Sequence, residues 1–207
     1  MNLIDLTQAI RSNTPVFPGD KTTQLDQVRS IEEDGFTNFR LISEMHVGTH
    51  LDGPLHKISE SPFIADLPLN HFTGKGVLID VRGENQVVFR ESYRTLIPQK
   101  NIVLFFSGLS DHFSEKDYFI SYPDLTDELA RFLVEQRVKM VGLDWCSPDH
   151  HPYPIHEILL GNNILILENL TNLDQLLDKP NFEVFAFPLK IEADSSPVRV
   201  VAKVNNK

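Results

Sequence analysis

A segment of eleven residues, 46–56, constrains this chain most, because it mixes metal-ligand side chains with helix breakers. It reads His46-Val47-Gly48-Thr49-His50-Leu51-Asp52-Gly53-Pro54-Leu55-His56. Two glycines and a proline disfavour a helix, so we expect an extended chain. Successive side chains of an extended chain point to opposite sides. His46, His50 and Asp52 therefore share one side. Val47 and Leu51 lie on the other side, which we assign to the core.

The polar side of this segment predicts a transition-metal site. Residues i and i+4 of a straight strand lie about 13 Å apart, at a rise of roughly 3.3 Å per residue. His46 and His50 can therefore share an ion only if the chain curls near Gly48, which glycine permits. His50 and Asp52 are close enough to share an ion directly. Imidazole and carboxylate ligands favour zinc, iron or manganese over calcium or magnesium.

Length and composition favour a single domain spanning residues 1–207. The chain has 207 residues, of which 41% are hydrophobic, enough for one sizeable core. No apolar run approaches the roughly 20 residues of a membrane span, and no signal-type stretch opens the sequence. A cytoplasmic protein is therefore expected. The single cysteine, Cys146, cannot form an intrachain disulfide.

The charge of the chain narrows the class of partner. The formal net charge is -10, which argues against nucleic acid, because phosphates bind to basic surfaces. The same charge argues against anionic membrane surfaces. We therefore expect a small-molecule substrate or another protein subunit as the partner.

Apolar strands outnumber helices, which predicts a layered α/β or α+β domain. A helix is expected over 126–136, because Thr126 is a suitable N-cap and an apolar stripe follows it. A second, short helix is expected to begin at His156. The strands are expected at 3–7, 36–50, 76–81, 102–106, 138–143, 164–167, 182–189 and 198–204.

Polar residues stand at the C-terminal ends of four expected strands: Asp80, Ser107, Asp144 and Glu168. That edge of an open α/β sheet is the usual place for a functional site. The pattern alone is weak, since strand ends are polar in most proteins.

The segment 46–56 resembles the signature His-x-Gly-Thr-His-x-Asp-x-Pro-x-His of the cyclase family, which includes bacterial kynurenine formamidases and isatin hydrolases. All seven fixed positions are present. Further segments along most of the chain are similar to the family's loops, strands and C-terminal ligand segment: 15–20, 122–125, 141–144, 156–160 and 164–170. The resemblance implies a swivelling β/β/α fold with mixed sheet layers and few helices. It also implies a homodimer or homotetramer.

The resemblance assigns a role to individual residues. Asp52 would bridge two divalent ions, and His56 would be the general acid/base. Zinc is the expected metal, as one or two ions, and manganese is the alternative. The expected metal ligands are His46, His50, Asp52, His156 and Glu168.

The implied reaction is hydrolysis of an amide-type bond, in an aryl formamide such as N-formylkynurenine or a cyclic amide such as isatin. A metal-activated water would attack the carbonyl group, and His56 would move the proton. Two other interpretations stay open. One is a catalytically silent metal- or metabolite-binding domain on the same fold. The other is an oxygen-using iron enzyme, since two histidines and a carboxylate can form a facial triad.

Phe17 is the expected substrate-binding residue. It lies in a turn with two prolines and a glycine, which is an unusual place for a core anchor. The matching loop of kynurenine formamidases typically carries tryptophan. Phenylalanine keeps an apolar platform but lacks the indole N–H. The choice between a formamide and an isatin-like substrate therefore stays open. We expect Cys146, which has no evident activating partner, to take no part in the chemistry.

Overall fold

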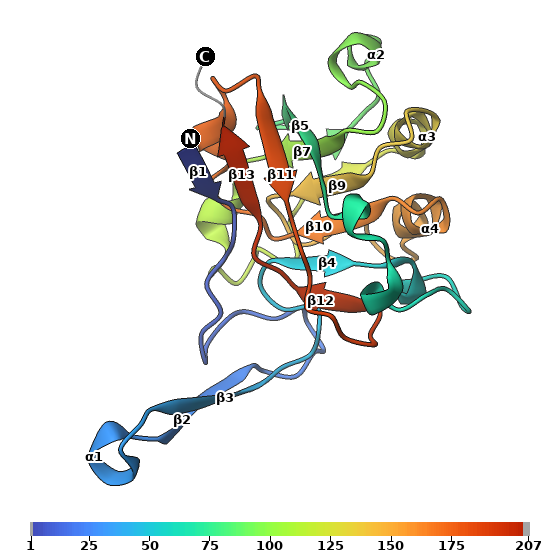
Figure 1. The fold of residues 1–207 in the computed structure, drawn as a ribbon. Helices are drawn as coiled ribbons and strands as arrows, with labels where there is room; N and C mark the ends of the chain where they lie inside the picture. The colour runs from blue at the N-terminus through green and yellow to red at the C-terminus, as the bar shows by residue number, and fades with distance from the viewer. Residues whose placement is uncertain (1, 205–207) are drawn as a thin grey trace.

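The chain folds around one large, curled sheet (Figure 1). A computed structural model describes residues 2–204. Within this range, nine strands form the main sheet, in the spatial order β1 (Asn2–Asp5), β13 (Val201–Val204), β11 (Phe182–Phe185), β5 (Thr73–Asp80), β7 (Ile102–Phe106), β9 (Met140–Leu143), β10 (Leu165–Glu168), β4 (His50–Asp52) and β12 (Ser195–Pro197). Two small sheets pair β2 (Gln24–Arg29) with β3 (Asn38–Ile42) and β6 (Gln86–Val87) with β8 (Asp124–Leu125).

The centre of the main sheet is parallel and buried on both faces. Strands β5, β7, β9 and β10 run parallel to one another, whereas β11 runs antiparallel to β5 and β4 runs antiparallel to β10. All five residues of β7 are buried, as expected for an apolar strand covered on both faces. Val103 and Phe105 pack into one core, and Ile102 and Leu104 into another. This alternation places a hydrophobic core on each side of the sheet.

Two helices cover one face of the sheet. Helix α3 (Asp127–Glu135) begins after Thr126, whose side chain accepts a hydrogen bond from the Leu129 N–H group. Helix α4 (Pro154–Gly161) packs beside it and contributes Leu159 to the same core. Both predicted helices are therefore confirmed. The other short helices are α1 (Ile31–Asp34), α2 (Tyr93–Leu96), η1 (Pro54–His56), η2 (Ile64–Asp66), η3 (Leu69–His71), η4 (Leu109–His112) and η5 (Leu173–Leu176).

The opposite face forms the second core because the sheet curls. Side chains of the central strands, such as Leu104 and Met140, share this core with Val184 of β11 and Ala202 of β13. The predicted mixed α/β fold with few helices is thus confirmed. Among residues 2–204, no helix combines the length and the apolar character needed to cross a membrane.

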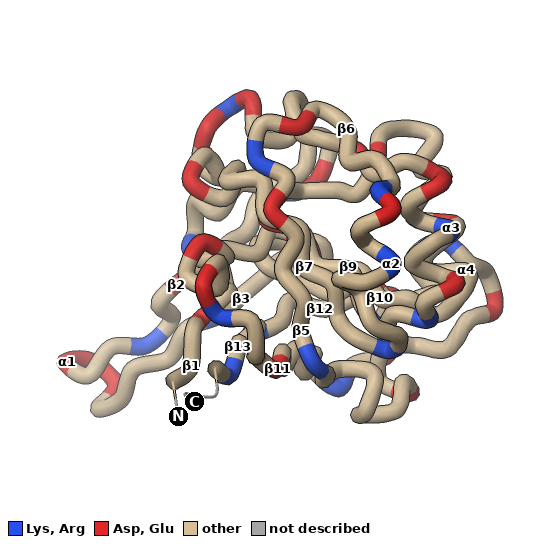
Figure 2. The backbone as a smooth tube through the Cα atoms, turned by 90° about the horizontal axis from the view of Figure 1, so that it is seen from above, with Lys and Arg blue, Asp and Glu red and all other residues tan. Residues whose placement is uncertain are grey.

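Some predicted strands are wrong in their extent. The strands predicted over 182–189 and 198–204 are shorter in the structure, and the one predicted over 36–50 is interrupted. The sequence predicts an extended chain over 36–50, but β3 ends at Ile42 and β4 begins only at His50. Strands β2 and β3, joined by α1, form an arm (residues 24–42) that projects from the body (Figure 1). Phe39 and Leu41 alternate with Asn38 and Arg40, as the core-facing side chains of a strand would, yet they are 54% and 49% exposed. No second layer covers this hairpin within the described residues. Figure 2 shows acidic residues at its tip around α1.

Candidate metal centre

The segment that carries the histidine motif curls between the arm and β4. Gly48 has a φ of +58°, in the left-handed region that glycine adopts without steric cost. The curl brings the His46 and His50 rings to a centroid distance of 5.1 Å. The Gly48 carbonyl oxygen lies 2.9 Å from His50 Nδ1 and also accepts a hydrogen bond from the Asn169 side chain. Since a carbonyl group only accepts, His50 Nδ1 carries the hydrogen and Nε2 is left for another partner.

Strand pairing brings a second ligand to His50. Glu168, the last residue of β10, is the cross-strand partner of His50, and Asp52 lies two residues further along β4. His50 Nε2 lies 3.3 Å from Glu168 Oε2 and 3.5 Å from Asp52 Oδ1. All three residues are at least nine-tenths buried. The β4–β10 pairing therefore collects one imidazole and two carboxylates in the interior of the protein.

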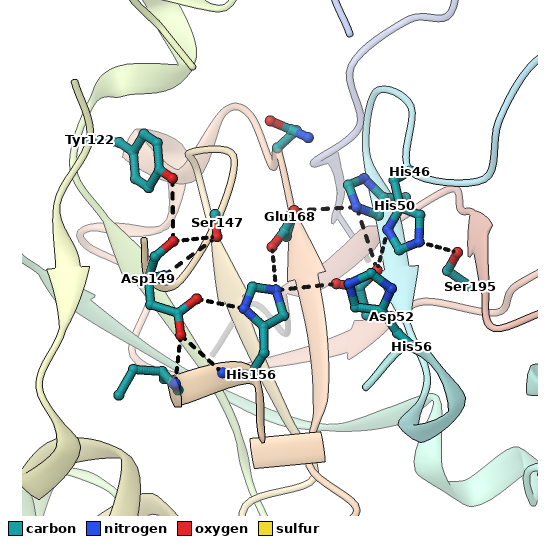
Figure 3. Close-up of polar contacts among 12 residues, drawn as sticks. His46, His50, Asp52, His56, Tyr122, Ser147, Asp149, His156, Glu168 and Ser195 are labelled. Carbon is teal, nitrogen blue, oxygen red and sulfur yellow. Dashed lines mark hydrogen bonds and ion pairs between the residues drawn. The ribbon is translucent and has the colours of Figure 1, made fainter. Parts of the chain in front are cut away.

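Helix α4 supplies His156 from the other side. His156 Nε2 lies 3.5 Å from Glu168 Oε1 and 4.0 Å from Asp52 Oδ2. Asp149 fixes the ring, because it accepts a hydrogen bond from His156 Nδ1 at 2.6 Å. Its other oxygen accepts from the backbone N–H groups of Ile155 and His156 at the start of α4. A carboxylate that orients a histidine in this way is a common partner of metal-ligating imidazoles. Figure 3 shows this chain of contacts.

His46 and His56 complete the cluster. His46 Nδ1 lies 3.0 Å from Asp52 Oδ1, and its Nε2 lies 2.9 Å from Asp194 Oδ2. His56 stands in η1, after Pro54 has begun this turn. Its ring centroid is 4.3 Å from that of His46 and 5.7 Å from that of His156. The structure therefore brings all five expected ligands and the expected acid/base into one cluster (Figure 3).

The donor atoms of this cluster fit a divalent ion. Within this cluster, four buried atoms have no hydrogen-bond partner among the described residues: His50 Nε2, Asp52 Oδ1, Asp52 Oδ2 and Glu168 Oε1. Leaving such atoms unpaired is costly in a protein interior, and a cation would satisfy all four. Two groups in the described part of the chain have ligand atoms that lie within 4.8 Å of one another: His46, Asp52 and His56, and His50, Asp52 and Glu168. Asp52 belongs to both groups.

The pKa values show that the centre favours positive charge. Burial lowers the pKa of His46, but the carboxylates of Asp52 and Asp194 outweigh burial and raise it to about 11. Burial likewise lowers the pKa of His156, yet Asp149 and Glu168 raise it to about 9. The pKa of Asp52 is held below its ordinary value, because nearby histidines outweigh its burial. The field that retains protons on these rings would also attract a metal cation.

The cluster lines a cavity of about 220 Å³, which suits a small molecule. Phe17 forms part of the wall and meets Phe119 edge-to-face, at a centroid distance of 6.0 Å. Lys57 also lines the cavity, with its amine 4.4 Å from the centre of the Tyr153 ring. The expected substrate-binding residue thus lies beside the metal ligands. Phe119, Lys57 and Tyr153 were not predicted from the sequence.

Most of the polar strand ends do not reach the cavity. Of the four residues, only Glu168 lines it. Asp80 pairs with exposed Arg82, and Asp144 accepts hydrogen bonds from the Ser107 and Gly108 N–H groups and from the Ser107 hydroxyl. Asp144 therefore joins the ends of β7 and β9, a structural role. Cys146 lines the cavity, but burial raises the pKa of its thiol, in agreement with the expectation that it is unreactive.

Three residues near the metal ligands were not predicted from the sequence. Asp149 and Asp194 hold histidine rings, and Asn169 holds the curl at Gly48. Asp149 lies close in sequence to His156, and Asn169 directly follows Glu168. This closeness to expected metal ligands is the signal that could have identified them. Asp194 lies far in sequence from all the metal ligands and from His56, and it belongs to no recognisable motif in its own segment.

Comparison with known proteins decides the family. Residues 4–150 match the sequence profile described as Putative cyclase. The chain belongs to this family. A kynurenine formamidase from Bacillus cereus is 30% identical over 205 residues, which cover 97% of this chain and 96% of that protein.

Solved structures agree with this assignment. Isatin hydrolase A from Labrenzia aggregata, bound to benzyl benzoate, superposes with a TM-score of 0.88 at 26% identity, over 99% of this chain and 94% of that one. A predicted metal-dependent hydrolase from Bacillus stearothermophilus gives a TM-score of 0.77 at 25% identity, over 97% of both chains. The family resemblance and the cyclase-like fold predicted from the sequence are confirmed, as is the prediction of a hydrolytic enzyme.

Proposed function

We propose that this protein hydrolyses the amide-type C–N bond of a small aromatic substrate, either an aryl formamide such as N-formylkynurenine or a cyclic amide such as isatin. One observation carries the proposal. Unpaired, buried ligand atoms of His50, Asp52 and Glu168 converge in a cavity that also holds His56 and the aromatic wall of Phe17. The relatives named kynurenine formamidase and isatin hydrolase support the same bond type.

The two oxygens of Asp52 suggest how two ions would be held. Oδ1 faces His46 Nδ1 and His50 Nε2, at 3.0 and 3.5 Å. Oδ2 faces His156 Nε2, which itself lies near Glu168. We therefore assign His46, His50 and Asp52 to one ion, and Asp52 and His156 to the other. Glu168 faces both His50 and His156 and would contact one or both ions. Zinc suits these ligands, and manganese is the alternative. When bound, such an ion polarises the carbonyl group and lowers the pKa of water towards about 7.

The chain's own residues would position the substrate and move the proton. The edge-to-face pair of Phe17 and Phe119 offers an apolar wall for the aryl ring. His56 would take a proton from the attacking water and deliver it to the leaving nitrogen as the C–N bond breaks. The products are a carboxylic acid and an amine, which remain one molecule when the substrate is a cyclic amide. Imidazole suits both transfers near neutral pH.

The test uses protein stripped with a chelator and reloaded with zinc or manganese. We expect hydrolysis of N-formylkynurenine, isatin or a simple aryl formamide, equal in air and under anaerobic conditions. His50→Ala should lose bound metal and turnover, while His112→Ala, an exposed histidine on η4, should keep both. Metal binding without turnover of any substrate would favour a silent binding domain. Oxygen-dependent turnover would favour an iron oxygenase.

We also propose that the protein forms a homodimer or homotetramer through the arm (residues 24–42). An isolated two-stranded hairpin is marginally stable in water, yet this one exposes a row of large apolar side chains: Val28, Ile31, Phe36, Phe39, Leu41 and Ile42. An exposed apolar patch of this kind marks an interaction surface. The body also exposes apolar residues, among them Phe187 and Leu189. A second copy of the chain can cover both surfaces.

A further inference from the structure

Asp194 contacts both His46 and His56 with a single oxygen atom. Its Oδ2 lies 3.2 Å from His56 Nδ1 and 2.9 Å from His46 Nε2. His46 has a second partner at that nitrogen, since the Ser195 hydroxyl lies 3.0 Å away. In the described part of the chain, the His56 ring has no hydrogen-bond partner besides Asp194. Removing Asp194 should therefore affect His56 more than His46.

The backbone fixes Asp194 beside the turn that carries His56. The Gly53 N–H group donates a hydrogen bond to the Asp194 carbonyl oxygen at 2.9 Å. A Cβ atom at Gly53 would lie 2.8 Å from that oxygen, so the approach requires glycine. Next along the chain, Ser195 is the strand partner of Asp52. The pairing of β12 with β4 thus continues into the Gly53–Asp194 hydrogen bond. It fixes the position of Asp194 relative to the metal ligand Asp52 and to the turn that carries His56.

We infer that Asp194 is the positioning residue for proton transfer by His56, an inference that rests on the proposed function. A carboxylate only accepts hydrogen bonds, so Nδ1 of the neutral His56 ring must carry the hydrogen. Nε2 is then unprotonated and free to act as the base. A ring of the opposite tautomer would hold its hydrogen at Nε2 and could not accept a proton there.

The proton balance of the step follows from this geometry. His56 Nε2 takes one proton from water while the water oxygen bonds to the carbonyl carbon. The ring then carries hydrogens on both nitrogens, and the unprotonated Asp194 carboxylate stabilises its positive charge. The same proton passes to the leaving nitrogen as the C–N bond breaks, which restores the neutral ring. Asp194 neither gains nor loses a proton.

The experiment compares Asp194→Asn with Glu192→Gln in zinc-loaded protein. The control makes the same carboxylate-to-amide change at an exposed position of the same loop. In Asp194→Asn, we expect kcat to fall roughly 10²-fold, the lower end of general acid–base contributions. KM should change by less than about threefold, since Asp194 does not line the cavity. Zinc content should stay unchanged, because His46 retains its contacts with Asp52 and Ser195. Glu192→Gln should match the wild type, and Asp194→Glu should recover part of kcat.

A second measurement does not depend on activity. Nitrogen-15 NMR of histidine-labelled, zinc-loaded protein reports which ring nitrogen of His56 is protonated, with the signal assigned by a His56→Gln variant. We expect the Nδ1–H form in the wild type and in Glu192→Gln, and loss of that preference in Asp194→Asn. If Asp194→Asn keeps the wild-type tautomer and kcat, the inference is wrong. A loss of kcat that saturating zinc fully restores would overturn it as well. If the wild type hydrolyses none of the substrates, the proposed function fails, while the tautomer still decides the role of Asp194.

Discussion

Glu168 stands directly opposite His50 in the antiparallel pairing of β10 with β4, and His50 Nε2 lies 3.3 Å from Glu168 Oε2. Directly opposed residues project to the same side of a sheet. Register thus delivers two ligands that are far apart in sequence to one point. A slip of one residue would turn Glu168 to the opposite face. The metal centre is therefore coupled to correct strand pairing.

This coupling leads to a prediction for Glu168→Gln. The substitution keeps the size of the side chain but removes a negative charge that faces His50 and His156. We expect the protein to hold one ion fewer than the wild type and kcat to fall by at least roughly 10²-fold. Metal-to-protein ratios from mass spectrometry and steady-state kinetics measure both effects.

The matched control is Glu183→Gln on β11. Glu183 pairs with Lys203 at a partly exposed position away from the cavity, and such pairs contribute little. The Glu183→Gln variant should therefore have the metal content and kcat of the wild type. Wild-type metal content and turnover in Glu168→Gln would rule out Glu168 as a ligand.

Metal affinity should increase with pH. In the metal-free protein, the pKa of His156 is raised from 6.5 to about 9, so the ring is protonated at neutral pH. A metal ligand must be neutral, so binding displaces this proton and becomes more favourable as pH approaches 9. The stability of the metal-free fold changes with pH in the opposite direction. A raised pKa stabilises the metal-free fold below about pH 6.5, and this stabilisation is lost as pH rises through about 9.

Thermal unfolding measures both consequences. From pH 6.5 to pH 8.5, the His156 contribution to the stability of the chelator-treated protein should decline, and the increase in Tm caused by zinc should grow. The comparison variant is His156→Gln, in which both pH dependences should be weaker. An increase in Tm on zinc addition that stays constant over this range would contradict the prediction.

The sequence predicted the chemistry of this centre better than its geometry. Residues 46–56 carry four of the six members, and their ligand types alone indicate a transition metal. Assigning His156 and Glu168 required the family resemblance, because nothing in their spacing relates them to His50. Strand register makes that connection, and register depends on pairing between segments that periodicity describes only one at a time.

The wrong prediction for the arm and the failure to predict Asp194 also have physical causes. Phe39 and Leu41 alternate as core residues do, but among residues 2–204 the arm that holds them has no layer to pack against. Hydrophobic periodicity identifies a face that needs cover and does not identify what covers it. Asp194 was missed for a related reason. It acts through a backbone pairing with Gly53, and a lone aspartate in a loop gives no sign of such a contact.

Phe17 should affect substrate binding more than turnover. Its ring lines the cavity beside Phe119 but lies outside the group of titratable residues. An aromatic contact contributes about 0.5–1.5 kcal/mol, so Phe17→Ala should raise KM by roughly 2- to 10-fold with a smaller change in kcat. Phe63→Ala serves as the control, because Phe63 is 40% exposed and does not line the cavity. A loss of kcat at unchanged KM would show that Phe17 does not bind the ground-state substrate.

The arm should govern the assembly state. A charge within a buried apolar interface is strongly unfavourable, so a Phe39→Asp and Leu41→Asp double variant should dissociate the oligomer. Both side chains are about half exposed in one chain and belong to neither hydrophobic core of the described residues. The fold of the body should therefore survive the change.

Sedimentation velocity should report a monomer near 23.6 kDa, while circular dichroism stays close to that of the wild type. Ile120→Asp, on an exposed position outside the arm, should leave the mass unchanged. A wild type that sediments as a monomer, or a double variant that keeps the wild-type mass, would show that the arm does not join copies of this chain.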